Sequence, residues 1–286
     1  MPLFDVYIAV DFSGSKDAGR QKSSIAVAEA HRGTTPETIK DRFSRFEVVL
    51  FVLQRLLHHN SKGKRVLCGF DFSYSFPKGF WHTLTGQPEI WSNMTSCLVN
   101  GIANLPPITE KPEPNAREWA GLANKKLAYG LGTGKGPFWG PGSTQSTDPK
   151  FPFSKVDFNE YRLTEKRGSG LKSIFKIGGN GTVGLQSLCG IPYLFQIQTT
   201  CVQQKVPLHC WPFDGWEPEG STHCLVEWYP SLYNKGEKSH EQDALACVNW
   251  AMGMDDQEKL QDHFVPDLSD DEKAQAMIEG WVLGIL

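Results

Sequence analysis

Four carboxylates occupy similar places in the sequence, each at or near the end of an apolar segment. Asp11 ends YIAVD, Asp71 ends CGFD and Glu227 ends CLVE, whereas Asp243 lies in the helical stretch HEQDALA. An unpaired charge in a protein interior costs several kcal/mol, so buried strands rarely end on acids without a reason. If the three strands are neighbours in one sheet, their ends meet at one edge, where α/β sheets bind ligands.

The chemistry available to such a group of acids is metal-assisted phosphoryl transfer. Hard divalent cations prefer carboxylate oxygens. Three or four carboxylates can hold two Mg²⁺ or Mn²⁺ ions about 3.5–4 Å apart, which clamp the attacking and leaving oxygens. His240 stands three residues before Asp243 and shares its helix face, whereas Glu241 does not. His240 is therefore a candidate for positioning or protonating a leaving group.

Each of these residues also has a plainer interpretation. An aspartate after a strand often forms the next turn, an acid inside a helix often pairs with a base one turn away, and a lone helical histidine is often a surface residue. Glu227 can likewise be an edge residue that pairs with a lysine. The functional interpretation gains its weight from the recurrence of acids at the ends of elements.

Two glycine-containing turns are candidates for binding phosphate. Ser13 and Gly14 lie in DFSGS directly after Asp11, and Gly179 and Gly181 lie in GGNGTVG before a predicted helix. The N-terminus of a helix binds phosphate through free backbone N–H groups. The G-x-G-x-x-G spacing also occurs in dinucleotide sites, but these need an acid about 20 residues later, and CVQQKV contains none. A tight turn packed on the sheet is the alternative.

Two basic residues near the second loop, Arg162 and Lys172 in YRLTEKRGSGLKS, are candidates for neutralising phosphate charge. The alternative is a charged face in contact with solvent. The formal net charge of −3 and the pI of about 6.2 predict no basic field over the whole molecule. They argue against tight, sequence-independent nucleic-acid binding, but not against an enzyme with a local basic groove beside an acidic, metal-filled centre.

A mixture of strands and helices must position these residues. Segments 5–11 and 23–30 are β-rich and flank a polar link with two glycines, as in a hairpin. A segment from Thr35 to about residue 60 has apolar residues at helical spacing. Further strands are predicted at 66–71, 207–211 and 222–228, and further helices after Pro77, over 115–130, after GGNGTVG, over 239–254 and from Ser269. This order predicts an α/β fold with a mixed central sheet flanked by helices.

We expect a single domain over residues 1–286, with residues 102–180 inserted into it. Much of this segment is rich in proline and glycine, as in PPITEKPEP and GLGTGKGPFWGPGSTQSTDP. Long loops of this kind in compact domains are usually functional or disordered. The segment is therefore predicted to be an insertion or lid.

The composition favours a cytoplasmic protein. The seven cysteines are odd in number and scattered, without a C-x-x-C pair, so reduced thiols are expected. The first residues lack the basic region and cleavage site of a signal peptide. No uncharged run approaches the roughly 20 residues that a membrane helix needs, so we expect no membrane association.

Four segments in order, AVDFSG, GFDFSYSFP, EWYPSLY and HEQDALACVNW, resemble the signature blocks of an uncharacterised family of predicted nucleases with a ribonuclease H-like fold. Some members carry automatic names linked to cobalamin or molybdopterin biosynthesis. The resemblance implies a RuvC-like site in which Asp11, Asp71, Glu227 and Asp243 match the acidic positions that bind two Mg²⁺ or Mn²⁺ ions. It also implies a sheet that starts with a three-strand meander, whereas the sequence pattern shows two strands before the helix expected at Thr35.

The leading hypothesis is thus a metal-dependent phosphodiester hydrolase that acts on nucleic acid or another phosphate ester. One alternative is an ATP-dependent phosphotransferase of the actin and sugar-kinase type, with DFSGS and GGNGTVG as phosphate loops and two lobes of similar length. Another is a non-catalytic ribonuclease H-like module that binds nucleic acid or a partner protein. Clustered acids speak against that last hypothesis, because a surface that only binds phosphates has no use for negative charge.

Overall fold

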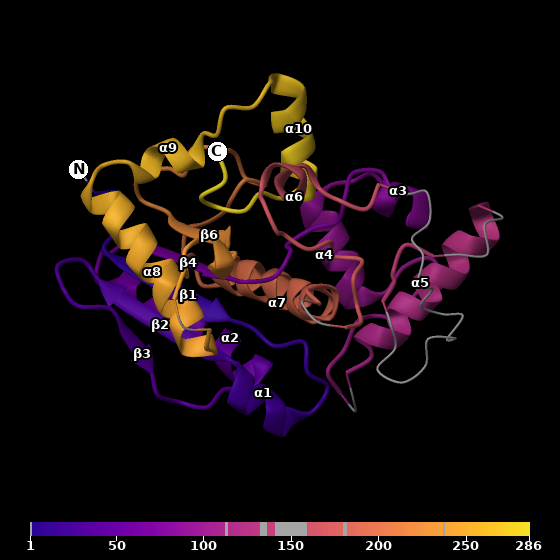
Figure 1. Cartoon of the computed structure of the whole chain (residues 1–286), viewed down its shortest axis with the longest axis horizontal. Coiled ribbons are helices and arrows are strands. Elements are labelled where there is room, and N and C mark those ends of the chain that lie inside the picture. Colours follow the sequence, from indigo (N-terminus) through magenta and orange to yellow (C-terminus); the bar gives the residue numbers. More distant parts are fainter. Residues whose placement is uncertain (1, 112–113, 132–135, 141–158, 180–181, 237) are drawn as a thin grey trace. The chain divides into compact units, whose positions relative to one another are not determined.

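A computed structural model describes the whole chain except residues 1, 112–113, 132–135, 141–158, 180–181 and 237 (Figure 1). The chain divides into two compact units. The first comprises Met1–Phe72, Gln196–Lys273 and Trp281–Leu286, and the second comprises Ser73–Phe195 and Ala274–Gly280. The four candidate acids all belong to the first unit. The predicted insertion 102–180 lies inside the second unit, which extends beyond it on both sides.

The first unit is built on a six-stranded mixed sheet in the order β3-β2-β1-β4-β6-β5. Strands β1, β2 and β3 form an antiparallel meander, and β4, β6 and β5 run parallel to β1. The predicted α/β fold with a mixed central sheet is confirmed. The strands are β1 (Val6–Asp11), β2 (Ala26–His31), β3 (Glu37–Ile39), β4 (Val66–Phe70), β5 (Leu208–Cys210) and β6 (His223–Glu227).

Helices α8 (His240–Asp256) and α2 (Arg45–Ser61) cover opposite faces of this sheet (Figure 1). Alternate residues of a strand point to opposite faces. Tyr7, which pairs with Ala30 of β2, donates a hydrogen bond of 2.6 Å to Asp255 of α8. Arg55 of α2 instead pairs with Glu29, the neighbour of Ala30. The two faces of β2 are therefore assigned to different helices.

The start of α2 differs from the prediction. Instead of a helix from Thr35, the chain first adds β3, whose Ile39 pairs with Val27 of β2. The helix begins only after Ser44, whose side chain accepts a hydrogen bond from the backbone of Glu47, while Glu47 accepts one from the backbone of Ser44. This reciprocal capping box fixes the start of a helix, and it outweighs the Thr-Thr-Pro sequence that suggested an earlier one.

The predicted hairpin link also contains a helix, α1 (Ala18–Ser24). Asp17 caps it by accepting a hydrogen bond of 2.7 Å from the backbone of Arg20, as short acidic side chains do at helix starts. As a result β2 begins at Ala26 rather than at residue 23.

Other helices were predicted as elements, namely α3 (Phe80–Thr85), α5 (Ala116–Leu131), α7 (Gly184–Gln203) and α10 (Asp270–Glu279). The sequence analysis did not single out α4 (Trp91–Asn100), α6 (Leu163–Arg167), α9 (Leu260–Phe264) or the 3₁₀ turn η1 (Pro230–Leu232). Among the described residues, no helix combines the length and the apolar character needed to cross a membrane.

Aromatic packing contributes to the core of the second unit. The ring centroids of Phe76 and Phe80 lie 4.6 Å apart, and those of Phe80 and Phe175 lie 4.9 Å apart. Phe138 meets Phe175 edge to face at 5.2 Å. Such pairs contribute about 0.5–1.5 kcal/mol beyond simple burial, so segments far apart in the sequence are held in one core.

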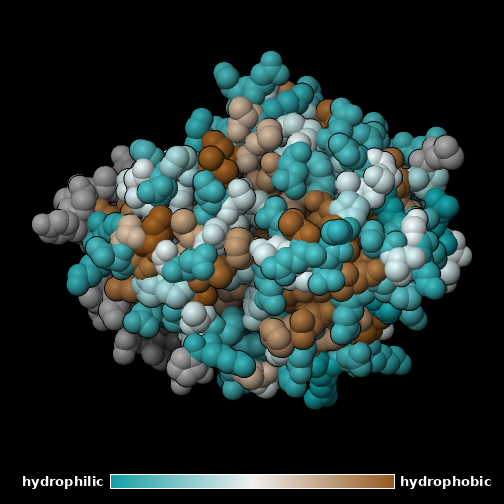
Figure 2. Space-filling model, turned by 180° about the vertical axis from the view of Figure 1, so that it is seen from behind, coloured by the Kyte–Doolittle hydropathy of each residue, from teal (hydrophilic) through white to brown (hydrophobic). Residues whose placement is uncertain are grey.

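The surface carries hydrophobic as well as hydrophilic residues. The view from behind shows brown residues gathered between teal ones (Figure 2). On α2, Phe46 and Leu50 are exposed large hydrophobic residues, while Val48, Val49 and Val52 of the same helix are buried against the sheet side. Since single exposed hydrophobic residues are normal on proteins, we attach no role to them.

Candidate metal centre

Asp11 and Asp71 lie side by side at the carboxyl edge of the sheet. Strands β1 and β4 are parallel, and Val10 pairs with Phe70 as the last partners. The ladder continues one step further, because the backbone N–H of Asp71 donates to Val10 O at 3.2 Å. The Asp71 carboxylate then turns back to accept a hydrogen bond of 2.5 Å from the backbone of Phe12. Two adjacent parallel strands therefore end on neighbouring carboxylates.

Helix α8 brings two more of the predicted residues to this edge. Its start is capped by Ser239, whose side chain accepts a hydrogen bond from Gln242 at 3.2 Å. His240, in the first turn, places its Nδ1 2.8 Å from Oδ1 of Asp11. Asp243 follows one turn later and accepts a hydrogen bond of 2.7 Å from the amide of Asn234. The i,i+3 spacing thus serves the site from one helix face.

The pKa values of these groups depend on burial and on one another. Burial raises the pKa of Asp11 from 3.8 to about 6; the hydrogen bond and charge of His240 oppose this rise, and the charges of Asp243 and Glu241 add to it. Burial and the charge of Asp11 raise the pKa of Asp71 well above its usual value, against the hydrogen bond from Phe12. The pKa of His240 is raised by its hydrogen bond to Asp11. Burial is therefore the main reason why Asp11 and Asp71 resist ionisation, and the charges of the neighbouring acids add to it.

Cys247 is a neighbour of these acids that the sequence analysis did not connect with them. Cys247 is buried one turn after Asp243 on α8. Its pKa is raised well above the usual value by burial and then by the charges of Asp71, Asp11 and Asp243. A thiol held protonated in this way is a poor nucleophile and a poor metal ligand. Cys247 is therefore a chemically inert neighbour of the acids. Its i+4 spacing from Asp243 on a predicted helix could have indicated from the sequence that the two residues lie close together.

Glu227 reaches the same edge but points to the other face of the sheet. It pairs with Phe70 across β4 and β6, one residue before Asp71. The next residue, Trp228, has its ring against the backbone of Gly69 and near Trp250 of α8. Because neighbouring residues alternate between faces, Glu227 lies on the face away from α8. It is 3% exposed, and its role as a fourth metal ligand stays a prediction that this register does not favour.

A buried arginine anchors the turn after Asp11 through hydrogen bonds. Arg45, the first residue of α2, is 1% exposed and donates hydrogen bonds to Ser13 O at 2.9 Å and Ser15 O at 2.7 Å. The Ser13 hydroxyl accepts a hydrogen bond from Ser24 at 2.8 Å, and Gly14 is half-buried. The turn is thus anchored through its carbonyl groups. No local sequence pattern predicts this contact between Arg45 and the turn, which lie about 30 residues apart in the chain.

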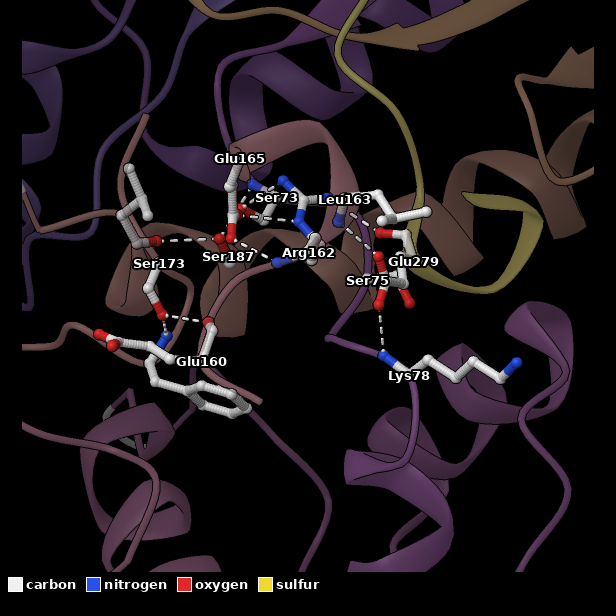
Figure 3. Close-up of polar contacts among 12 residues, drawn as sticks. Ser73, Ser75, Lys78, Glu160, Arg162, Leu163, Glu165, Ser173, Ser187 and Glu279 are labelled. Carbon is white, nitrogen blue, oxygen red and sulfur yellow. Dashed lines mark hydrogen bonds and ion pairs between the residues drawn. The ribbon is translucent and has the colours of Figure 1, made fainter. Parts of the chain in front are cut away.

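Arg162, a predicted phosphate ligand, is instead part of the interior of the second unit (Figure 3). Its Nε lies 2.9 Å from Oε1 of Glu165, and both side chains are 1% exposed. Its remaining donors bond to Glu279 O at 3.0 Å and to the Ser73 hydroxyl at 3.1 Å. Arg162 therefore joins α6, α10 and the segment after β4 as a structural residue. Its guanidinium is enclosed and is not presented to a ligand.

The other predicted phosphate ligands also belong to the second unit. Lys172 is exposed. Gly179 is exposed and has a φ of 80°, a conformation that favours glycine. Gly181 lies outside the described residues. The structure thus brings together Asp11, Asp71, Asp243 and His240 in the first unit, and describes Lys172 and Gly179 as surface residues of the second.

The carboxylates of Asp11, Asp71 and Asp243 are called here the acidic cluster. Their oxygens suit Mg²⁺ or Mn²⁺ better than softer ions, but they do not all lie within 4.8 Å of one another, so one ion bound by all three would have to draw them closer. In the part of the chain that the structure describes, no lysine or arginine forms an ion pair with any of the three, and His240 is the partner of Asp11. A bound cation would supply the missing positive charge. Comparison with protein-family models, curated proteins and solved structures finds no match to this chain.

Proposed function

We propose that the chain is a metal-dependent phosphodiester hydrolase, a nuclease of ribonuclease H-like fold that acts through the acidic cluster. The observation that carries the proposal is the adjacency of Asp11 and Asp71 on parallel strands, with the charge of Asp243 on α8 acting on both, and with no lysine or arginine paired with any of the three in the described residues. Groups with raised pKa values at a sheet edge are typical of functional sites.

The sheet topology supports the ribonuclease H-like part of the proposal. The family resemblance implies a three-strand meander at the start of the sheet, and β1, β2 and β3 form one. Strand β4 then pairs with β1 in parallel, and β6 with β4, so that β1, β4 and β6 have their carboxyl ends at the same edge. A fold of this kind does not by itself fix an activity, so the function rests on the acidic cluster.

Each residue of the site has a separate part in the proposed reaction. Asp11, Asp71 and Asp243 would hold two Mg²⁺ or Mn²⁺ ions, which supply an activated water and neutralise the charge of the phosphoryl group. His240 is 50% exposed in its side chain, and its Nδ1 is engaged by Asp11, so its other ring nitrogen is free to approach a leaving oxygen. The raised pKa keeps this ring more protonated near pH 7 than a free imidazole, as a general acid requires.

The substrate side of the proposal is a nucleic acid or another phosphate ester. Ser13 and Gly14 lie directly after Asp11, on the turn that Arg45 anchors. They are the predicted phosphate contacts that belong to the same unit as the acidic cluster. In this proposal the backbone N–H groups of the turn would bind a phosphate of the substrate.

The decisive experiment is a calorimetric titration of Mn²⁺ into the wild type and into Asp11→Asn and Asp71→Asn, with the fold checked by circular dichroism. Asp41→Asn is the matched control, because Asp41 is an exposed aspartate of the same unit outside the acidic cluster. We expect binding in the wild type and the control, and about a tenfold or greater loss in the other two. Hydrolysis of single-stranded DNA, RNA and bis(p-nitrophenyl) phosphate with Mn²⁺ should follow the same pattern.

The result that would overturn the proposal is full hydrolysis by folded Asp11→Asn. The same assays address the alternatives. A kinase of the actin type has two comparable lobes. Here every named strand among the described residues lies in the first unit. We therefore expect that ATP does not raise the melting temperature of the protein. Nucleic-acid binding that persists in EDTA without turnover would instead support a binding module.

A further inference from the structure

A second group of metal-type ligands lies on the opposite face of the same sheet. Glu29 and His31 stand two residues apart on β2, so they point to the same face. His59 comes from the last turn of α2, the helix that covers this face. None of the three was singled out in the sequence, because the pair on β2 has the ordinary alternation of a half-buried strand.

The ligand atoms of this group are already close to the geometry of a metal site. His31 Nε2 lies 3.0 Å and His59 Nε2 lies 3.7 Å from Oε1 of Glu29. One ligand atom from each residue lies within 4.8 Å of the other two. In a tetrahedral zinc site with bonds of 2.0–2.1 Å, neighbouring ligand atoms are about 3.3 Å apart. The observed distances bracket that value, so small side-chain rotations would bring all three atoms onto one ion.

The group is buried and incompletely satisfied. Glu29 is 3% exposed and His59 is 4% exposed. Neither ring nitrogen of His59 has a hydrogen-bond partner. Leaving buried polar atoms of this kind unpaired costs about 1–3 kcal/mol each, so the fold bears a cost here that a ligand would remove. The rings of His31 and His59 meet edge to face at 5.4 Å.

The two oxygens of Glu29 have different neighbours. Oε2 lies 2.9 Å from Nε of Arg55, which stands one turn before His59 on α2. Oε1 faces the two histidines. A carboxylate that is held by an ion pair at one oxygen and presents the other to imidazoles resembles a ligating carboxylate oriented by a neighbouring group.

We propose that Glu29, His31 and His59 bind a divalent transition-metal ion of the Zn²⁺ class. Two imidazoles and one carboxylate select zinc-like ions over Mg²⁺ or Ca²⁺, which prefer all-oxygen sites. The side chain of His31 is 39% exposed, so solvent reaches the group and can supply the fourth ligand. This site is independent of the acidic cluster and of the function proposed for it.

The register of β1 and β2 separates the two sites. Ile8 of β1 pairs with Glu29, whereas Asp11 pairs with Ala26. Three residues of a strand span about 10 Å, and the side chains of Asp11 and Glu29 belong to opposite faces. A variant at one site therefore leaves the ligands of the other in place.

The test uses the full-length protein and Co²⁺, an optical probe that replaces Zn²⁺. We expect the metal-free wild type to bind Co²⁺ with the intense visible absorption of a tetrahedral or five-coordinate site, and Zn²⁺ to displace it. His31→Gln should weaken binding by about tenfold or more, since loss of even a ligand's hydrogen-bond partner costs about 10–100-fold. His59→Gln should do the same.

Two control variants make the result specific. His58→Gln removes an exposed histidine whose ring contacts that of His59 at 5.1 Å but that is outside the group. Asp11→Asn removes one carboxylate of the acidic cluster. Both should keep the cobalt spectrum. Because His31 is partly exposed, His31→Gln tests the site even if the buried His59 variant fails to fold. Absence of the visible band in the wild type, or the same band and affinity in His31→Gln and His58→Gln, would overturn the proposal.

Discussion

Replacing Asp11 by asparagine should stabilise the metal-free protein above neutral pH, although it removes a residue of the proposed site. Asp11 is 6% exposed, and burial raises its pKa from 3.8 to about 6 despite the hydrogen bond with His240. Ionising this carboxyl in the folded state therefore has a free-energy cost. Asparagine keeps the shape and can still accept a hydrogen bond from His240, but it carries no charge.

The magnitude and the sign follow from the same pKa. The difference between 3.8 and about 6, at about 1.4 kcal/mol per pH unit, corresponds to about 3 kcal/mol. Because the folded-state pKa of Asp11 is the higher one, folding favours the protonated form. Its contribution to stability is therefore full below about pH 4 and is lost as the pH rises through about 6. Asp11→Asn should be more stable than the wild type by up to about 3 kcal/mol at pH 8, and about equally stable near pH 4.

The assay is urea denaturation in EDTA over this pH range, with Asp41→Asn at an exposed position as the surface-charge control. Addition of Mn²⁺ should then reverse the order, since a ligand that binds only the folded protein raises its stability by mass action, and Asp11→Asn has lost the ligand group. The reasoning is refuted if Asp11→Asn is less stable than the wild type at pH 8 without metal. An unchanged difference between pH 4 and pH 8 would refute it equally.

Two further predictions concern the packing of each unit. Arg162→Met should destabilise the protein by about 3–5 kcal/mol, because it removes the buried guanidinium that pairs with the carboxylate of Glu165. Lys172→Met, at an exposed position, should change stability by less than about 0.5 kcal/mol in the same denaturation assay. Gly69→Ala should cost about 1–3 kcal/mol, because an added Cβ would lie 2.1 Å from Val226 O; an unchanged melting temperature would contradict this.

Local sequence signals predicted those parts of the fold that depend on neighbouring residues. The strand that ends at Asp71 and the helix that starts at His240 have apolar runs with clear ends, and both lie close to their expected positions. The third strand was missed because Thr35 and Pro36 imitate a helix start, whereas the true cap is formed by Ser44 with Glu47.

What the sequence could not provide is the register between strands and the pairing of distant side chains. A strand that ends on an acid predicts a carboxylate at the sheet edge, but not the face to which it points, and a shift of one residue reverses that face. Glu227 illustrates this, since its pairing with Phe70 directs it away from α8. The meeting of Glu29 with His59 depends on α2 packing over β2, which no local pattern encodes.

The alanines of β2 give the acidic cluster its dimensions without taking part in its chemistry. Ala26, Ala28 and Ala30 share the face under α8 and are almost completely buried, so the helix rests on methyl groups. A larger side chain at Ala28 would lift α8 and carry His240 away from Asp11, with every polar group of the site still present. In a saturation-mutagenesis screen, substitutions by larger residues at Ala26, Ala28 or Ala30 would then abolish activity, although these positions hold no functional group. The side-chain volume that β2 accepts under α8 would decide which sequences keep an active site.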